Sequence, residues 1–305
     1  MITKFSLRNL FPDNSNINFL RFKVIGFIAS IILVVGTVVS LSVNSLNFGI
    51  DFTGGILFEV RLPNKTDLGG VRKILTELEI GDVSIQTLGD ERDVMIRLGV
   101  KDESKRDEHI EKIKLILKGE FSENIEFRKV EFVGGEVGGD MIKKGITSII
   151  FTIIGIIIYV WYRFNWQYSI GIIAGLLHDL IITVGFLSLT RFEFNTTSIA
   201  AILAVLGYSV NDTVVIYDRV RENIRKIRKK PMDYILNLST NETLSRTLLT
   251  VITTLIAVAA LVLYGGEALR SFSITVFVGI VVGTYSSIFI SVPIVAFFQK
   301  SRPSN

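Results

Sequence analysis

Six runs of apolar residues, each long enough to cross a lipid bilayer, constrain most strongly what this chain can fold into. A helix needs about 20 residues to span about 30 Å of hydrocarbon. Because lipid cannot hydrogen-bond an exposed backbone, runs of this length fold as helices. The sequence therefore predicts an α-helical polytopic membrane protein with six transmembrane helices, at approximately 22–43, 145–162, 167–189, 197–217, 247–264 and 272–298.

The composition agrees with this fold class and excludes several kinds of site. The chain has 305 residues, and a hydrophobic content of 49% combined with a mean hydropathy of +0.49 is too apolar for a soluble globular domain. It has no cysteine, which excludes disulfides and thiolate metal sites, and its two histidines are not at metal-ligand spacing. The first apolar run lacks a signal-peptidase site, which favours an uncleaved span. No metal and no cofactor are expected.

Lysine and arginine in the short flanks of the spans predict the orientation of the protein in the membrane. They are concentrated before the first span, in the connection at about 218–246, and after the last span. The opposite short loops hold only Arg191 and Arg270. We expect a cytoplasmic N-terminus (1–21), a basic cytoplasmic loop (about 218–246) and a cytoplasmic C-terminus (299–305). The basic connection could also bind a partner or membrane lipids.

The long segment at 44–142 is predicted to be a periplasmic domain, between the first transmembrane helix (22–43) and helices two to six (143–298). Alternating or periodic apolar residues indicate a strand at 56–62, a helix at 67–78, strands at 83–88 and 94–98, a helix around 110–117 and a strand at 125–133. This βαββαβ order is typical of an α+β ferredoxin-like fold. That fold has many functions, so it favours none of them.

Asp212 is the first candidate functional residue, because it lies inside the fourth apolar run. A charge at membrane depth costs about 2.5–3.5 kcal/mol on insertion scales and is usually retained for function. Polar residues surround it in the sequence, including Tyr208 and Asn211. A carboxyl group between an apolar environment and a cation can take up a proton on one side and release it on the other. The alternative is a fixed salt bridge.

Two further residues extend this prediction to the neighbouring spans. Asp179 follows Gly171 and Gly175 at four-residue steps, on a face that lets helices approach closely. It could handle protons directly, or it could be a structural carboxylate hydrogen-bonded across helices. Arg246 begins the fifth span, one turn before Thr250, at a depth where it could be the counter-ion of Asp212. Alternatively, it reaches lipid head groups. Protons are the expected coupling ion.

Glycine pairs occur near both ends of the predicted periplasmic domain. Asp51, Gly54 and Gly55 follow the first span and predict an irregular turn before the first strand. Gly134 and Gly135 begin a glycine-rich stretch that predicts a hinge into the second span, with a plain loop as the alternative.

Three motifs together resemble one protein family. Asp51-Phe-Thr-Gly-Gly55, the pair His178-Asp179 and, above all, the stretch 207–223 are similar to the SecF family, membrane subunits of the bacterial Sec protein translocase. The resemblance covers the whole chain. It implies half of a resistance-nodulation-division type fold that pairs with SecD. It also implies use of the proton-motive force to draw unfolded preproteins out of the SecYEG channel, with Asp212 and Arg246 as the family's intramembrane pair.

The same resemblance implies a bacterial inner-membrane location and a set of partners. These are SecD, the SecYEG channel and the preprotein, joined by SecA, YajC, YidC and membrane lipids, with no nucleic acid. No covalent catalysis is expected, so the chain is not predicted to be an enzyme. Two rival functions remain, half of a small-molecule exporter of the same superfamily and a passive scaffold of the translocon. An intramembrane aspartyl protease using Asp179 and Asp212 is a weaker third.

Overall fold

The computed structural model describes residues 16–63, 68–78, 80, 83–88, 90–100, 105–121, 125–227 and 230–300. These residues divide into two compact units. The helical unit combines the described residues up to Asn47 with those from Ser148 onward, and the α/β unit is Phe48–Thr147. The chain therefore leaves the helical unit once and returns to it once. The predicted termini at 1–15 and 301–305 lie outside the described residues.

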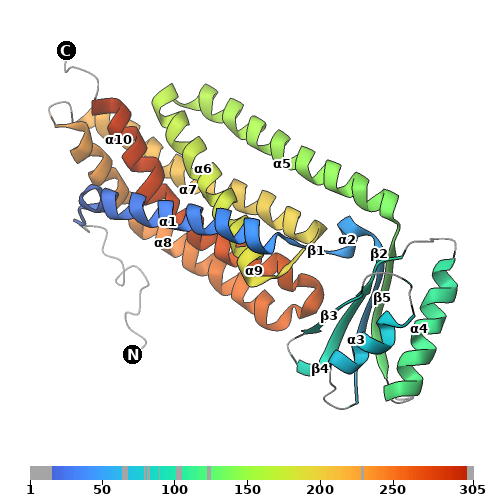
Figure 1. Ribbon diagram of the computed structural model, residues 1–305. Helices are drawn as coiled ribbons and strands as arrows, with labels where there is room; N and C mark the ends of the chain where they lie inside the picture. Colours follow the sequence, from blue (N-terminus) through green and yellow to red (C-terminus); the bar gives the residue numbers. More distant parts are fainter. Residues whose placement is uncertain are drawn as a thin grey trace, which may run out of the picture. The chain divides into compact units, whose positions relative to one another are not determined.

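Long apolar helices make up the helical unit (Figure 1). They are α1 (Lys23–Asn44), preceded by a 3₁₀ turn (Phe19–Phe22), α5 (Gly135–Arg163), which belongs to this unit only from Ser148 onward, α6 (Trp166–Thr190), α7 (Thr196–Lys226), α8 (Met232–Tyr264), and α9 (Gly266–Ser286), which continues through a π-helical stretch (Ser287–Ser291) into α10 (Val292–Lys300). In the described part of the chain, six helical segments are long and apolar enough to cross a membrane. The predicted six long apolar segments are therefore confirmed as helices and as candidate membrane spans.

The predicted basic loop at 218–246 is wrong over most of its length, because α7 continues to Lys226 and α8 already begins at Met232. Charged side chains at helical spacing stabilise the extension of α7. The Glu222 carboxylate accepts a hydrogen bond of 2.6 Å from Arg219 and another of 2.6 Å from Lys226. The charged residues after position 217 mark where the fourth apolar run ends, but α7 itself continues to Lys226.

The helices of this unit differ in how much of their surface is covered. In the most apolar window of each, 56% of α6, 56% of α7 and 61% of the α9–α10 span is buried, against 11% of α5 and 17% of α8. The interior is therefore built from α6, α7 and the last span. Glycine permits the close approach, since a Cβ on Gly279 would lie 2.3 Å from Val205 Cγ2 and a Cβ on Gly171 would lie 2.4 Å from the Tyr217 hydroxyl.

The α/β unit holds one four-stranded antiparallel sheet. Its elements in chain order are β2 (Gly55–Arg61), α3 (Leu68–Thr76), β3 (Val83–Leu88), β4 (Asp90–Leu98), α4 (Arg106–Phe121) and β5 (Glu126–Val133), and the sheet order is β3-β4-β2-β5. Phe58 and Ile96 of the sheet share a buried core with Leu75 of α3 and Ile113 of α4. The two helices therefore cover one face of the sheet. Three short elements complete the chain, β1 (Asn47–Phe48), α2 (Ile50–Thr53) and β6 (Glu193–Phe194).

Glycine is required where the chain turns from α2 into β2. Gly54 has φ of 70° and Gly55 has φ of 120°, a region that side chains with a Cβ rarely adopt. A Cβ on Gly55 would also lie 2.3 Å from the carbonyl oxygen of Leu98 on the neighbouring strand. The glycine pair therefore lets the backbone turn sharply and join the sheet at once.

The glycine-rich stretch after β5 is predicted to be a hinge, with a plain loop as the alternative. The structure excludes the plain loop, because Gly135 is the first residue of α5 and only Gly134 lies between β5 and the helix, and the hinge stays a prediction. Gly138, one turn into α5, faces the α2 turn, where a Cβ would lie 2.8 Å from the Phe52 carbonyl oxygen. Glycine at this position lets α5 pack closely against α2. The many glycines of this stretch therefore do not indicate an irregular backbone.

Candidate functional site

Asp179 lies on α6, fully buried, and both of its carboxylate oxygens have partners. The Ser209 hydroxyl on α7 donates a hydrogen bond of 2.5 Å to Oδ2, and His178 Nδ1 lies 3.2 Å from Oδ1. Gly283 of α9 leaves room for this contact, since a Cβ there would be 3.0 Å from Ser209 Cβ and 3.5 Å from Asp179 Oδ2. The carboxylate therefore sits where three helices meet.

Asp212 lies on α7, one turn beyond Ser209, and is 4% exposed. Its environment differs from that of Asp179, because its Oδ2 is buried and receives no hydrogen bond from any described residue. A buried polar atom without a partner carries the full cost of its desolvation. Of Asp179 and Asp212, the two carboxyl groups predicted to lie at membrane depth, Asp212 is therefore the one with an unsatisfied oxygen among the described residues.

Arg246 lies on α8 and is exposed, close enough to act electrostatically on Asp212. No nitrogen–oxygen distance between these two described side chains falls within 4.0 Å, so the predicted counter-ion pair is not formed in this structure. One turn further along α8, the Thr250 hydroxyl donates to the carbonyl oxygens of Arg246 (3.1 Å) and Thr247 (2.8 Å). Arg246 is thus near enough to Asp212 to affect its charge, but the two side chains do not form an ion pair.

Tyr208 is on the same face of α7 as Asp212, one turn earlier. Its hydroxyl is buried and directed at Thr250 and Thr254 of α8, although it makes no hydrogen bond of standard geometry with a described residue. Asn211, in contrast, is exposed on another face of α7. The structure therefore brings Asp212, Tyr208, Thr250 and Arg246 together between α7 and α8, places Asp179 on the α6 side of α7, and leaves Asn211 outside.

A second polar contact links α7 to the last span, and sequence reasoning missed its partners. The hydroxyls of Thr213 and Ser287 are 2.9 Å apart. Ser287 begins the π-helical stretch, which ends at Ser291 with a buried hydroxyl lacking a standard hydrogen bond to the described residues. Such π-bulges occur often at functional sites. The serines at four-residue spacing were visible in the sequence, but that spacing equally indicates close helix packing.

The remaining predicted motif residues belong to the α/β unit. Asp51 lies in the first turn of α2 and is half-buried. Gly54 and Gly55 follow it, and Gly134 and Gly135 join β5 to α5. Because Gly135 Cα lies 2.8 Å from where a Cβ on Gly54 would be, the two glycine pairs pack against each other. They form a structural junction between α2, β2 and α5.

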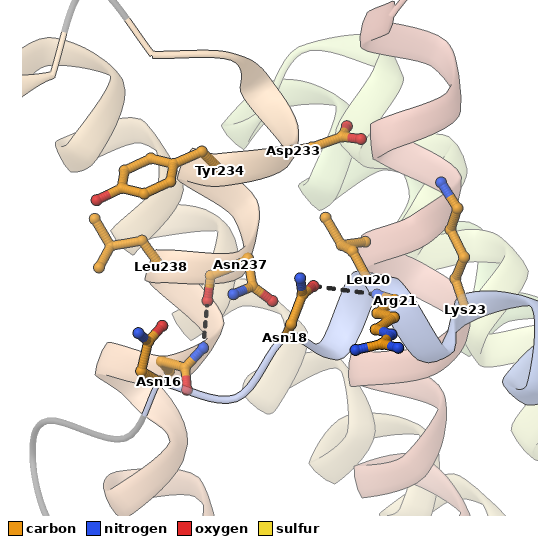
Figure 2. A pocket seen from close by; sticks show the side chains of 10 residues that line it. Asn16, Asn18, Leu20, Arg21, Lys23, Asp233, Tyr234, Asn237 and Leu238 are labelled. Carbon is orange, nitrogen blue, oxygen red and sulfur yellow. Dashed lines mark hydrogen bonds between the residues drawn. The ribbon is translucent and has the colours of Figure 1, made fainter.

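A cavity of about 480 Å³ lies between the first described residues and α8, and none of the predicted site residues lines it (Figure 2). Asparagine side chains of α8 bind the backbone here. Asn241 accepts from the Ile17 N–H and donates to the Ile17 carbonyl oxygen, both at 2.8 Å, and Asn237 accepts from the Phe19 N–H at 2.8 Å. Amide side chains thus hold the segment before α1 on α8.

Comparison with known proteins identifies the family. Residues 112–301 match the family model described as protein export membrane protein SecD/SecF, C-terminal, and residues 39–62 match the SecD/SecF GG motif. The protein translocase subunit SecF of Rickettsia bellii is 50% identical over 293 residues, 96% of this chain and 97% of that protein. The chain belongs to the SecF family. SecF of Rickettsia akari is similar at 49% identity, covering 97% of this chain and 96% of its own length.

Solved structures agree with the SecF assignment. The chain is similar to the crystal structure of SecDF, a translocon-associated membrane protein from Thermus thermophilus, with a TM-score of 0.86 and 30% identity over 95% of this chain. A SecDF structure in a super-membrane-facing form gives a TM-score of 0.67 at 28% identity over 94% of this chain. The chain spans 39% of the length of each of these SecDF chains. The GG motif of the family covers Gly54 and Gly55, whose positive φ angles require glycine.

Proposed function

We propose that this SecF-family chain is one half of a proton-driven membrane motor that, together with SecD, promotes export of preproteins through SecYEG. The relatives' name and the 39% coverage of SecDF support the pairing, since the remainder of those longer chains leaves room for a second half. One charge moving through 100 mV is worth about 2.3 kcal/mol, enough to bias a two-state change of a few kcal/mol. No covalent chemistry is required, so the proposed activity is not that of an enzyme.

The observation that carries the proton-handling role is the contrast between the two buried carboxyl groups. Asp179 has a hydrogen-bond partner on each oxygen, whereas Asp212 Oδ2 has none among the described residues. A proton or a water molecule bound at Asp212 would satisfy that oxygen, while Asp179 gains nothing comparable. We therefore assign proton exchange to Asp212 and a supporting, helix-joining role to Asp179.

Arg246 and the hydroxyls around it complete the proposed proton pathway. An arginine beside Asp212 but not bonded to it can stabilise the ionised carboxylate in one state and be displaced in another. The hydroxyls of Tyr208 and Thr250 lie on the facing sides of α7 and α8, where they can order water between the two charged groups. Water at this depth is required for protons to pass.

The α/β unit is proposed to be a ferredoxin-like periplasmic domain that contacts the preprotein. Its order of elements and its sheet order β3-β4-β2-β5 support this fold, because the first and third strands of the unit, β2 and β4, are adjacent in the centre. We further propose a bacterial inner-membrane location with both termini cytoplasmic. SecA, YajC, YidC and membrane lipids remain proposed partners.

Three alternatives make different predictions. A passive scaffold would not need a titrating carboxyl group, and a small-molecule exporter would need a substrate cavity in the α/β unit. An aspartyl protease would need its two carboxyl groups to share a proton, yet the partners of Asp179 are Ser209 and His178, and no hydrogen bond joins it to Asp212 in the described structure.

The test is export in sealed vesicles that contain the chain with SecD, SecYEG and SecA, with and without an imposed pH gradient. Asp212→Asn keeps the shape and removes the titration, so it should abolish stimulation by the gradient and leave ATP-driven export intact. Glu222→Gln, an exposed carboxyl on the same helix, is the control and should behave as wild type. Full stimulation of the Asp212→Asn variant would show that the aspartate is structural and would favour the scaffold.

Arg246 variants add a graded readout in the same vesicles. Arg246→Lys keeps the charge but loses the planar guanidinium, whereas Arg246→Met loses both. Stimulation should fall in the order wild type, lysine, methionine. Equal activity of the three proteins would assign Arg246 to lipid head groups and remove it from the pathway.

A further inference from the structure

Arg163, the last residue of α5, is bound to α7 through an ion pair in which one guanidinium nitrogen contacts both oxygens of a carboxylate. Arg163 Nη2 lies 2.8 Å from Asp218 Oδ1 and 3.0 Å from Oδ2. Asp218 is six residues beyond Asp212 on the same unbroken helix, a distance of about 9 Å along the axis. The proposed proton carrier and this ion pair are therefore rigidly connected through α7.

A second arginine of α7 binds the backbone of the same residue. Arg221 Nη1 donates to the Arg163 carbonyl oxygen at 3.3 Å and lies 3.7 Å from Asp218 Oδ1. A cation at this position also complements the negative end of the α5 dipole. We call Arg163, Asp218 and Arg221 the α5–α7 clasp, because α7 holds both the side chain and the main chain of the α5 terminus.

Both arginines of the clasp lie over the ring of a buried phenylalanine. The guanidinium carbons of Arg163 and Arg221 lie 5.3 Å and 5.7 Å from the centre of the Phe164 ring. Phe164 is 6% exposed and packs edge-on against Tyr217, at 6.1 Å between ring centres. Cation–π contacts fix the orientation of both guanidinium groups. The geometry therefore distinguishes this ion pair from an ordinary mobile pair on a surface.

The helix held by the clasp is continuous with the α/β unit. α5 begins at Gly135, and only Gly134 separates it from β5. Along its membrane-spanning part α5 is the most exposed of the six spans, with 11% of its apolar window buried. A helix with so little of its surface buried is held to its neighbours at few points, and the ion pair at Arg163 is one that joins it to α7.

We propose that the α5–α7 clasp transmits movement from Asp212 on α7 to the α/β unit through α5. This inference rests on the proposed proton-driven function and names the residues that couple it to the α/β unit. Arg163 and Asp218 are 40% and 42% exposed, and exposed ion pairs contribute little to stability. The clasp is therefore a positioning device, and breaking it should uncouple the motor without unfolding it.

The test compares Asp218→Asn with Glu222→Gln in the full complex, reconstituted in sealed vesicles. Each variant removes one carboxylate from the same end of α7, but among the described residues Glu222 pairs only with Arg219 and Lys226 of its own helix. Export stimulated by a pH gradient and proton uptake by the vesicles are measured together. Asp218→Asn should lower the stimulation about fivefold or more and retain proton uptake, and Glu222→Gln should retain both.

Arg163 variants separate a link from a merely structural role. Arg163→Gln breaks the same ion pair without altering α7 and should uncouple in the same way, also if Asp218→Asn fails to assemble. Arg163→Lys should restore part of the stimulation, because one hydrogen bond to Asp218 remains possible. Wild-type stimulation in Arg163→Gln would overturn the inference. So would loss of proton uptake together with stimulation, because the clasp would then support the proton site itself.

Failure of the underlying function would look different. If Asp212→Asn kept full stimulation, the proton route would lie elsewhere, whatever the clasp variants did. If Asp212→Asn lost both stimulation and proton uptake while Arg163→Gln kept both, the motor would stand and the clasp would be excluded as its link.

Discussion

The Ser209 hydroxyl on α7 donates a 2.5 Å hydrogen bond to the Asp179 carboxylate on α6. This bond joins two helices in the interior of the helical unit, and it makes the surroundings of Asp179 different from those of Asp212. It satisfies Asp179 and joins α6 to α7 one turn away from Asp212, whose own Oδ2 stays without a partner among the described residues. The same helix thus carries a satisfied polar contact and, one turn away, the carboxyl group to which we propose to assign proton exchange.

Ser209→Ala should destabilise the subunit, because Asp179 Oδ2 would be left buried without its donor. The loss is expected to be about 1–3 kcal/mol, measured as a lower midpoint of thermal unfolding in detergent. Ser286→Ala is the matched control, since within the described part of the chain the buried Ser286 hydroxyl donates only to the Gly283 carbonyl oxygen of its own helix, at 3.1 Å. Equal effects of the two variants would contradict the assignment of Asp179 as a helix-joining residue.

Gly279→Ala should destabilise the subunit although alanine is the better helix former. A Cβ at Gly279 would lie 2.3 Å from Val205 Cγ2, so the methyl group forces α7 and α9 apart at a cost of about 1–3 kcal/mol. Gly207→Ala provides the comparison, because a Cβ there meets no atom within 4 Å and should gain up to about 1 kcal/mol. The isolated subunit in detergent is the sample. A stable Gly279→Ala protein would mean that α7 and α9 pack less closely than described.

Gly55→Ala should weaken the α/β unit without affecting the helical unit. Its φ of 120° and the Leu98 carbonyl oxygen 2.3 Å from a Cβ both exclude a side chain. The expected cost is about 1–3 kcal/mol for the backbone strain alone. Pulse proteolysis of the full-length protein in urea reports the opening of this unit. Gly119→Ala, on the exposed side of α4, is the control and should be neutral or slightly stabilising. If the two variants opened equally easily, the α/β unit would not depend on glycine at position 55.

Single cysteines test the proposed orientation directly, because the natural chain contains none. Ser84→Cys, exposed on β3, should react with an impermeant maleimide added outside intact spheroplasts. Lys230→Cys, exposed between α7 and α8, should react only after the membrane is opened. Labelling of both cysteines from the same side would refute the proposed placement of the α/β unit and the orientation argued from lysine and arginine.

Local patterns along the chain were sufficient to predict the six spans and the position of Asp212 in one of them. The length of an apolar run determines whether it can cross hydrocarbon, and that length is a property of the sequence. The glycine pair of the GG motif likewise indicated an irregular turn, which the positive φ angles explain. Helix ends were less predictable, because Gly135 and Lys226 belong to helices whose extension depends on packing and on paired charges.

The sequence by itself determined which segments enter the membrane, because hydrophobicity acts on each segment separately. Only the tertiary structure decided which side chains meet, such as Ser209 with Asp179 and Arg163 with Asp218. These pairs are 30 and 55 residues apart, and each contact depends on the rotation of two helices about their axes. That rotation is set by how glycines, serines and bulky side chains fill the shared interface, a sum over many weak contacts that no single motif encodes.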